Sequence, residues 1–133
     1  MTDENTRANV AEDLARSNES LRAARLLIDG GLLRDAESRI YYAAFHAVSA
    51  LLLTSGLEPR THAGVSQLLN LHFVKGGRLD SGDSRLFARL QKYRIEADYS
   101  AAFVVTKDAV EEDFAACSAF IGRVRAAIAA VLP

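Results

Sequence analysis

An arginine and a histidine lie seven positions apart in the most apolar part of the chain, Ser38-Arg-Ile-Tyr-Tyr-Ala-Ala-Phe-His46. Each residue of an α-helix advances by about 100°, so Arg39 and His46 point in the same direction, two turns apart. Tyr42 lies between them on this stripe. Removing a guanidinium and an imidazole from water is costly unless they are paired or face a cleft. We therefore expect these three side chains to form a buried polar network or to open onto a site.

Arg39 and His46 have the chemistry needed to cleave RNA without a metal ion. Such a cleavage needs a base for the 2′-hydroxyl proton, an acid for the leaving 5′-oxygen and positive charge beside the phosphate. We expect His46 to transfer protons, because histidine titrates near neutral pH, and Arg39 to stabilise the charge. Tyr42 either positions the phosphate or packs. The stripe holds a single histidine, so two copies paired about a two-fold axis would supply both acid and base.

Other catalytic groups are poorly represented in the sequence. The three histidines have no histidine or cysteine partners at metal-ligand spacing, and no glycine-rich loop joins a strand to a helix. We therefore expect no metal and no cofactor. Cys117 is the only cysteine, which excludes an intrachain disulfide and is typical of a reducing compartment. We expect it to be a small core residue rather than a nucleophile.

The composition is typical of one globular domain. The 133 residues are 50% hydrophobic and 25% charged, with a net charge of -1, so we expect a single domain over residues 1–133. The segment Met1 to Asn9 is polar, unlike a secretory signal. The longest apolar run, Ile40 to Leu53, is too short to span a bilayer. These features predict a cytoplasmic protein with no membrane partner.

The spacing of the apolar residues predicts an all-α, up-and-down bundle of four long helices and one short helix. Only two prolines occur, and paired glycines mark helix ends and the longest loop, Lys75 to Gly82. The expected helices are Thr6–Ile28, Leu33–Thr54, Thr61–Phe73 with Thr61 as its N-cap, Asp83–Tyr99, and a last helix with Thr106 as its N-cap. The second of these is apolar on more than one side, so we expect it to be the most buried.

One basic stripe lies on the expected fourth helix. Arg85, Arg89 and Lys92 follow one another at spacings of four and three, which places them on one face. Such a stripe is either a solvated face or a track for a phosphate backbone. We include these three residues among the candidates for substrate binding.

Five segments of the chain occur in an order that resembles a known superfamily. They are Ser38-Arg-Ile-Tyr-Tyr-Ala-Ala-Phe-His46, Gly56, Thr61-His-Ala-Gly-Val65, Phe73-Val-Lys-Gly-Gly77 and Tyr93-Arg-Ile-Glu-Ala-Asp-Tyr99. From about Leu14 to the end of the last helix, the chain resembles the HEPN superfamily, most closely its small stand-alone prokaryotic members. The resemblance implies a helical bundle that forms a homodimer. Many members are metal-independent ribonucleases with an arginine, a short spacer and a histidine, as in Arg39 and His46.

The resemblance also implies a partner. Stand-alone HEPN proteins are often encoded beside a minimal nucleotidyltransferase, and the two act as toxin and antitoxin. In some pairs the transferase attaches AMP to a tyrosine near the toxin's active site. Arg94, Asp98 and Tyr99 either form a structural network or line the same cleft, with Tyr99 as the AMP acceptor. His62, which follows the expected N-cap, is interpreted as structural, and His72 has no motif support.

Three functions remain open at this point. The protein is an RNA-cleaving toxin, a non-catalytic nucleotide-binding or accessory subunit of the transferase, or a plain helical interaction module. Ile40 stands directly after Arg39, where active HEPN families often have a polar residue. The first two functions require Arg39 and His46 to open onto a solvent-filled cleft at a dimer interface, whereas the third requires them to be only a buried polar network.

Overall fold

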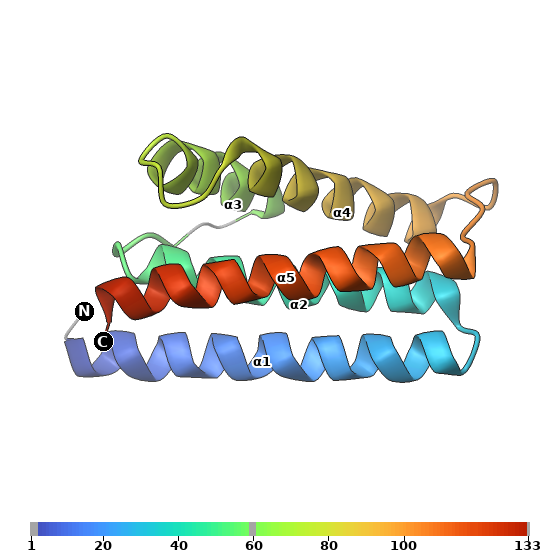
Figure 1. Cartoon of the computed structure of the whole chain (residues 1–133), viewed down its shortest axis with the longest axis horizontal. Helices are drawn as coiled ribbons and strands as arrows, with labels where there is room; N and C mark the ends of the chain where they lie inside the picture. Colours follow the sequence, from blue (N-terminus) through green and yellow to red (C-terminus); the bar gives the residue numbers. More distant parts are fainter. Residues whose placement is uncertain (1–2, 59–60, 133) are drawn as a thin grey trace.

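The computed structural model describes residues 3–58 and 61–132 and consists of helices joined by short links (Figure 1). The helices are α1 (Asp3–Asp29), α2 (Leu33–Leu53), α3 (His62–Leu69), the π-helical turn η1 (Asn70–Val74), α4 (Ser81–Tyr99) and α5 (Lys107–Val131). No strand occurs among the described residues. The predicted all-α bundle of four long helices and one short helix is confirmed.

Helix α2 is the centre of the bundle, as its sequence predicts. It contacts α1, α3, α4 and α5, and Figure 1 shows it between α1 on one side and α3 and α4 on the other. Small side chains let its neighbours approach closely: Ala43, Ala44 and Ala47 are fully buried. Ser17 of α1 donates a buried hydrogen bond of 2.7 Å to the carbonyl oxygen of Ala43. This contact fixes α1 against the middle of α2.

Local sequence signals define most of the helix ends. Gly31, after α1, has a φ of +78°, a left-handed conformation that favours glycine and turns the chain into α2. The predicted N-caps are confirmed. The Thr61 hydroxyl accepts a hydrogen bond of 2.9 Å from the amide of Gly64, and that of Thr106 accepts one of 3.2 Å from Ala109.

Two helix starts lie earlier than predicted. Helix α1 begins at Asp3 rather than Thr6, and α4 begins at Ser81 rather than Asp83. The start of α4 is a capping box in which the Asp80 carboxylate accepts from the amide of Asp83, and the Asp83 carboxylate accepts from that of Asp80. Aspartate replaces the usual Glu or Gln in this box, so the motif is not evident in the sequence.

Helix α5 is long and apolar enough, by length and a mean hydropathy of 1.5, to meet the criterion for a membrane-spanning segment. The expectation of no membrane-spanning segment rested on the apolar run Ile40 to Leu53 in α2. Val110, Phe120 and Val124 of α5 are buried in the core, where this helix packs against α2. Cys117, also on α5, is fully buried, and its thiol contacts the carbonyl oxygen of Ile40 at 3.4 Å. These contacts account for the apolar side of α5 as a core-facing stripe.

A pair of carboxyl groups is buried where α2 meets α5. Glu37 is 2% exposed and Asp113 is 5% exposed, and Arg89 of α4 forms an ion pair of 2.8 Å with Asp113. Burial, followed by the hydrogen bond and the negative charge of Asp113, raises the pKa of Glu37 to about 8. Glu37 is therefore largely protonated at neutral pH, and its carboxyl group acts as the hydrogen-bond donor to the Asp113 carboxylate.

Candidate functional site

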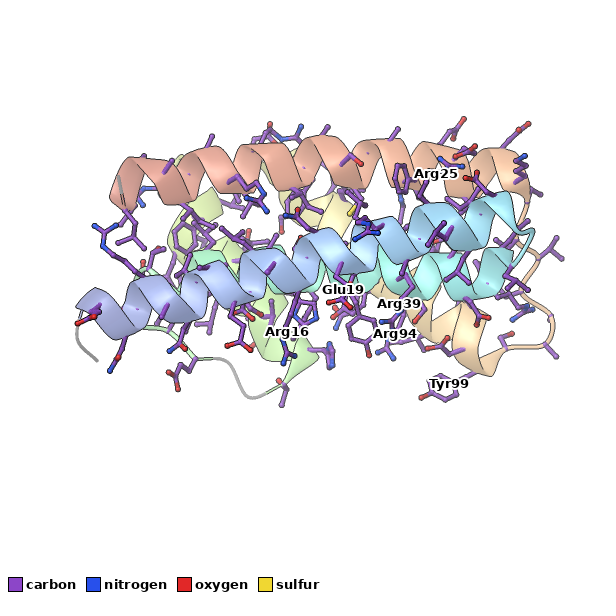
Figure 2. All side chains as sticks on the ribbon, turned by 90° about the horizontal axis from the view of Figure 1, so that it is seen from below. Arg16, Glu19, Arg25, Arg39, Arg94 and Tyr99 are labelled. Atoms are coloured by element: carbon purple, nitrogen blue, oxygen red, sulfur yellow. The ribbon has the colours of Figure 1, made fainter. Side chains whose placement is uncertain are left out.

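Arg39 and His46 line the same hollow between α1 and α2. The hollow has a volume of about 360 Å³, and α1 contributes Arg16, Glu19, Ser20 and Ala23 to its lining. In Figure 2, Arg16, Glu19 and Arg39 lie along the same side of the molecule. The two residues that the sequence places on one stripe therefore open onto a shared, solvent-accessible space in the single chain.

His46 has a setting that favours its neutral form. Its side chain is 19% exposed, and its Nδ1 atom lies 4.0 Å from Oδ1 of Asp13 on α1. Burial lowers the pKa of His46, and the positive charges of Arg16 and Arg39 lower it further. Burial also raises the pKa of Asp13. A neutral imidazole beside two guanidinium groups can accept a proton near a bound anion.

His46 also lines a second hollow. Its volume is about 250 Å³, and its other lining residues are Asp13, Phe45, Ser49, Leu53, Leu57 and Glu58. Helix α2 and the link that follows it provide most of this lining. His46 therefore lines both a polar hollow and a more apolar one.

Tyr42 lies beneath two guanidinium groups. The Cζ atom of Arg39 lies 4.8 Å from the centre of the Tyr42 ring, and that of Arg94 lies 5.8 Å from the same centre. Arg94 also forms an ion pair of 3.6 Å with Asp98, one turn later on α4. The structure thus brings Arg94, one of the residues singled out by the sequence, to the Arg39 stripe (Figure 2).

His62 also lies among the rings and guanidinium groups around Tyr42, a position that its local sequence does not predict. Its ring centre lies 4.7 Å from that of Phe45 and 6.0 Å from that of Tyr42. Its Nδ1 atom is 2.6 Å from the hydroxyl oxygen of Tyr41. Burial lowers the pKa of His62, and the charge of Arg94 lowers it further. The signal in the sequence was the Thr61-His62 pair, which places a histidine at the first position of α3.

The basic stripe of α4 has partners of its own. Arg89 pairs with Asp113 on α5, Arg85 donates a hydrogen bond of 3.2 Å to Ser81, and Lys92 lies 4.0 Å from Glu96. None of these three residues lines the hollow of Arg39 and His46. Their role in substrate binding therefore stays a prediction, with Arg89 in a structural ion pair.

Tyr99 lies at the last position of α4 and is 79% exposed. Figure 2 shows it on the same side of the molecule as Arg94, farther along toward the end of the helix. Asp98, beside it, is held by Arg94. The exposed hydroxyl of Tyr99 is accessible to a modifying enzyme, and its role as an AMP acceptor stays a prediction.

No cluster of three or more His, Cys, Asp or Glu side chains that could hold a metal ion occurs within residues 3–58 and 61–132. His72, the third histidine, is exposed on η1. The groups near Tyr42 and His46 that can transfer protons are His46 itself, His62 and Asp13. The fixed positive charges of the site are Arg16, Arg39 and Arg94.

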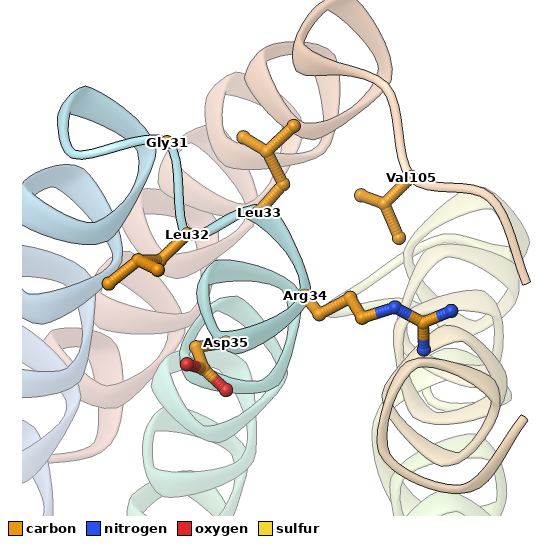
Figure 3. Close-up of a pocket in the computed structure, with 6 residues that line it drawn as sticks. All are labelled: Gly31, Leu32, Leu33, Arg34, Asp35 and Val105. Carbon is orange, nitrogen blue, oxygen red and sulfur yellow. The ribbon is translucent and has the colours of Figure 1, made fainter. Parts of the chain in front are cut away.

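Another hollow, of about 460 Å³, lies where α1 turns into α2. One of its lining residues, Arg34, has a structural role. Figure 3 shows Arg34 reaching from the start of α2 toward the segment that carries Val105. Its guanidinium donates to the carbonyl oxygens of Ala97 at 2.7 Å and Ser100 at 3.0 Å, and also to that of Phe103. Arg34 thus holds the link between α4 and α5 against α2.

We expect Arg34→Gln to lower the free energy of unfolding by about 2 kcal/mol, because several carbonyl oxygens lose a charged donor. Urea denaturation followed by circular dichroism measures this change. Arg22→Gln, at an exposed position on α1, is the matched control. A loss below about 0.5 kcal/mol would show that solvent replaces the guanidinium at these carbonyls.

Comparison with known proteins identifies the family of the chain and agrees with its helical fold. The HEPN domain family matches residues 11–127. A Methanocaldococcus jannaschii protein named "Putative toxin MJ0605" is 35% identical over 116 residues, which cover 87% of this chain and 86% of that protein. A second protein of that organism, "Putative toxin MJ0142", is 34% identical over 98 residues, covering 74% and 67%. A Pyrococcus horikoshii UPF0332 protein is 45% identical over 71 residues, covering 53% and 50%. The chain therefore belongs to the HEPN family.

Proposed function

We propose that this protein is a metal-independent endoribonuclease and the toxin of a HEPN/nucleotidyltransferase toxin–antitoxin pair. The observation that carries the proposal is the shared hollow in which Arg39 and His46 both face solvent beside Arg16. The names of the two Methanocaldococcus jannaschii relatives support a toxin role. A homodimer, RNA as the substrate and a minimal nucleotidyltransferase as the antitoxin are parts of the same proposal.

In the proposed reaction, neutral His46 removes the proton from the 2′-hydroxyl of a ribose. The 2′-oxygen then bonds to phosphorus, and the bond from phosphorus to the 5′-oxygen breaks. Arg39 stabilises the additional negative charge on the phosphate oxygens. The lowered pKa of His46 suits the base, because the free imidazole is its main form at neutral pH.

The leaving 5′-oxygen needs a proton, and His46 of a second copy is the proposed donor. The negative charge of a bound phosphate favours protonation of one of two imidazoles that share it. The products are a 2′,3′-cyclic phosphate and a 5′-hydroxyl group. This step makes the dimer a requirement of the mechanism, and cleavage by a monomer would contradict it.

The proposal is tested by incubating the purified protein with a synthetic RNA in the presence of EDTA and analysing the ends of the products. We expect cleavage to a cyclic phosphate, and we expect Arg39→Gln to slow it by about a hundredfold or more. Arg22→Gln, on α1 and outside the hollow, should leave the rate unchanged. Loss of activity in EDTA, or an Arg39→Gln rate equal to that of the wild type, would refute this function.

The toxin role has a separate test in cells. Expression of the protein should arrest growth, and co-expression of a minimal nucleotidyltransferase should relieve the arrest. If the antitoxin acts by transfer of AMP to Tyr99, mass spectrometry should find AMP on this residue, and Tyr99→Phe should remain toxic in the presence of the transferase. Arrest that persists with every transferase tested would remove the partner from the proposal.

A second candidate function is a non-catalytic nucleotide-binding or accessory subunit of the transferase. The specific observation in its favour is Ile40, which is fully buried in the core and so adds no polar group beside Arg39. The rings and guanidinium groups around Tyr42 could then hold a nucleotide without cutting RNA. In this case the wild type would bind nucleotides, and neither the wild type nor His46→Ala would cleave RNA or arrest growth.

A further inference from the structure

Arg94 has a hydrogen-bond donor that the protein does not use. Its side chain is 13% exposed, and its one ion pair, with Asp98, is 3.6 Å long. Its Nε atom is buried and has no hydrogen-bond partner among the described residues. A buried donor left without an acceptor destabilises the folded state, and such donors are rare in folded proteins. Arg94 therefore has an unused donor, and a rotation of its partly exposed side chain is needed to bring this donor to an anionic ligand.

His62 is held in one tautomer by Tyr41. The Tyr41 side chain is fully buried, and burial raises the pKa of its hydroxyl, which stays protonated and donates to Nδ1 of His62 at 2.6 Å. The lowered pKa of His62 keeps its ring neutral, so the single ring proton is on Nε2. The two ring nitrogens point to opposite sides of the imidazole. His62 therefore presents an N–H donor away from the buried tyrosine.

Two arginine–histidine pairs, Arg39 with His46 and Arg94 with His62, lie around the ring of one tyrosine, Tyr42. Around Tyr42 lie the guanidinium groups of Arg39 and Arg94, at 4.8 and 5.8 Å, and the imidazole rings of His46 and His62, at 6.4 and 6.0 Å. The first pair comes from α2 alone, whereas the second comes from α4 and from the start of α3. A chain of phosphates, whose oxygens only accept hydrogen bonds, matches two such sets of donors.

We propose that Arg94 and His62 form a second phosphate-binding subsite, which holds the phosphate next to the one at Arg39 and His46. The protein would then bind two consecutive phosphates of a single RNA strand, one at each arginine–histidine pair around Tyr42. The identity of the strand as RNA rests on the proposed function. In the bound state the phosphate takes the place of Asp98 as the main counter-charge of Arg94.

The test uses 2′-O-methyl dinucleotides and trinucleotides, which contain one and two phosphates and cannot be cleaved because the 2′-oxygen is blocked. Isothermal titration calorimetry measures the dissociation constants. For the wild type, we expect the trinucleotide to bind about tenfold more tightly than the dinucleotide, because a second phosphate gains charged hydrogen bonds. Arg94→Gln should abolish this gain, so that the trinucleotide and the dinucleotide bind equally well, whereas Arg39→Gln should weaken the binding of both.

Two controls separate a lost contact from a damaged fold. Arg94→Lys keeps the charge and should retain part of the gain, and Arg22→Gln, outside the cluster, should retain all of it. Circular dichroism and the Tm of each variant show whether the bundle is intact. Equal binding of the dinucleotide and trinucleotide by the wild type, or a full gain in Arg94→Gln, overturns the subsite.

His62 has a spectroscopic readout that a purely structural role would not change. Nitrogen-15 NMR of the free protein should find Nδ1 of His62 as an acceptor and Nε2 as the protonated nitrogen. The trinucleotide should shift the Nε2–H resonance, whereas the dinucleotide should shift mainly that of His46. A His62 resonance that does not respond to the trinucleotide would remove this residue from the subsite.

The experiments distinguish a failure of the proposed subsite from a failure of the proposed nuclease function. Cleavage is measured with unmodified RNA. The gain in affinity from the dinucleotide to the trinucleotide is measured with the 2′-O-methyl oligonucleotides. A gain without any cleavage supports the subsite and refutes the nuclease. Cleavage without a gain in affinity for the trinucleotide supports the nuclease and refutes the subsite. If none of the oligonucleotides binds, the subsite is refuted.

Discussion

Replacing His46 with alanine is expected to slow RNA cleavage by about a thousandfold, because the variant loses the group that removes the 2′-hydroxyl proton. The side chain lines the hollow next to Arg39, so the substitution leaves the positive charge of the site in place. RNA affinity should therefore change much less than the cleavage rate. Single-turnover cleavage of a labelled RNA, together with binding to its 2′-O-methyl form, measures the two effects.

The pH dependence of the wild-type rate identifies the same group. Because burial and two neighbouring arginines lower the pKa of His46, the acidic limb of the profile should have its midpoint below the ordinary pKa of histidine. His46→Ala should lose this limb. His72→Ala, at an exposed histidine on η1, is the matched control and should keep both the rate and the limb. If His46→Ala cleaves RNA within about twofold of the wild-type rate, His46 is not the base.

Glu37→Gln is expected to stabilise the protein at pH 8 by about 2 kcal/mol or more. Folding raises the pKa of Glu37 from 4.5 to about 8, so the folded state binds a proton that the unfolded state has lost. The resulting stability is complete below pH 4.5 and is lost as the pH rises through about 8. Glutamine stays neutral and can donate to Asp113 at every pH. The difference in the free energy of unfolding between the Glu37→Gln variant and the wild type should therefore grow from pH 5 to pH 8.

Urea denaturation of both proteins at several pH values measures this difference. Glu112→Gln, at an exposed position on the same α5 that carries Asp113, is the control and should show no such trend. A Glu37→Gln variant that is less stable than the wild type by the same amount at pH 5 and pH 8 would show that Glu37 is ionised in the fold.

The sequence predicts those parts of the molecule that depend on neighbours along the chain. The helices follow from the apolar spacing, and Thr61 and Thr106 act as caps because capping needs only residues within one turn. The common direction of Arg39 and His46 follows from helical periodicity alone. These are the features that the structure contains as expected.

The remaining features depend on which helices pack together, and local patterns do not determine this. His62 joins the cluster because α3 folds back over α2, and the sequence near His62 indicates only a helix start. Arg89 looks like part of an open basic stripe, but α5 places Asp113 beside it. In both cases the decisive partner lies on another helix, more than twenty residues away in the sequence.

The three buried alanines of α2 also affect how the hollow of Arg39 and His46 can respond to a ligand. Ala43, Ala44 and Ala47 carry only methyl groups, so α2 has no rotamers to adjust where these residues pack against its neighbours. We therefore expect the helix backbones that carry Arg16 and His46 to move little when a ligand binds. A ligand should then have to fit the width that α1 and α2 already set.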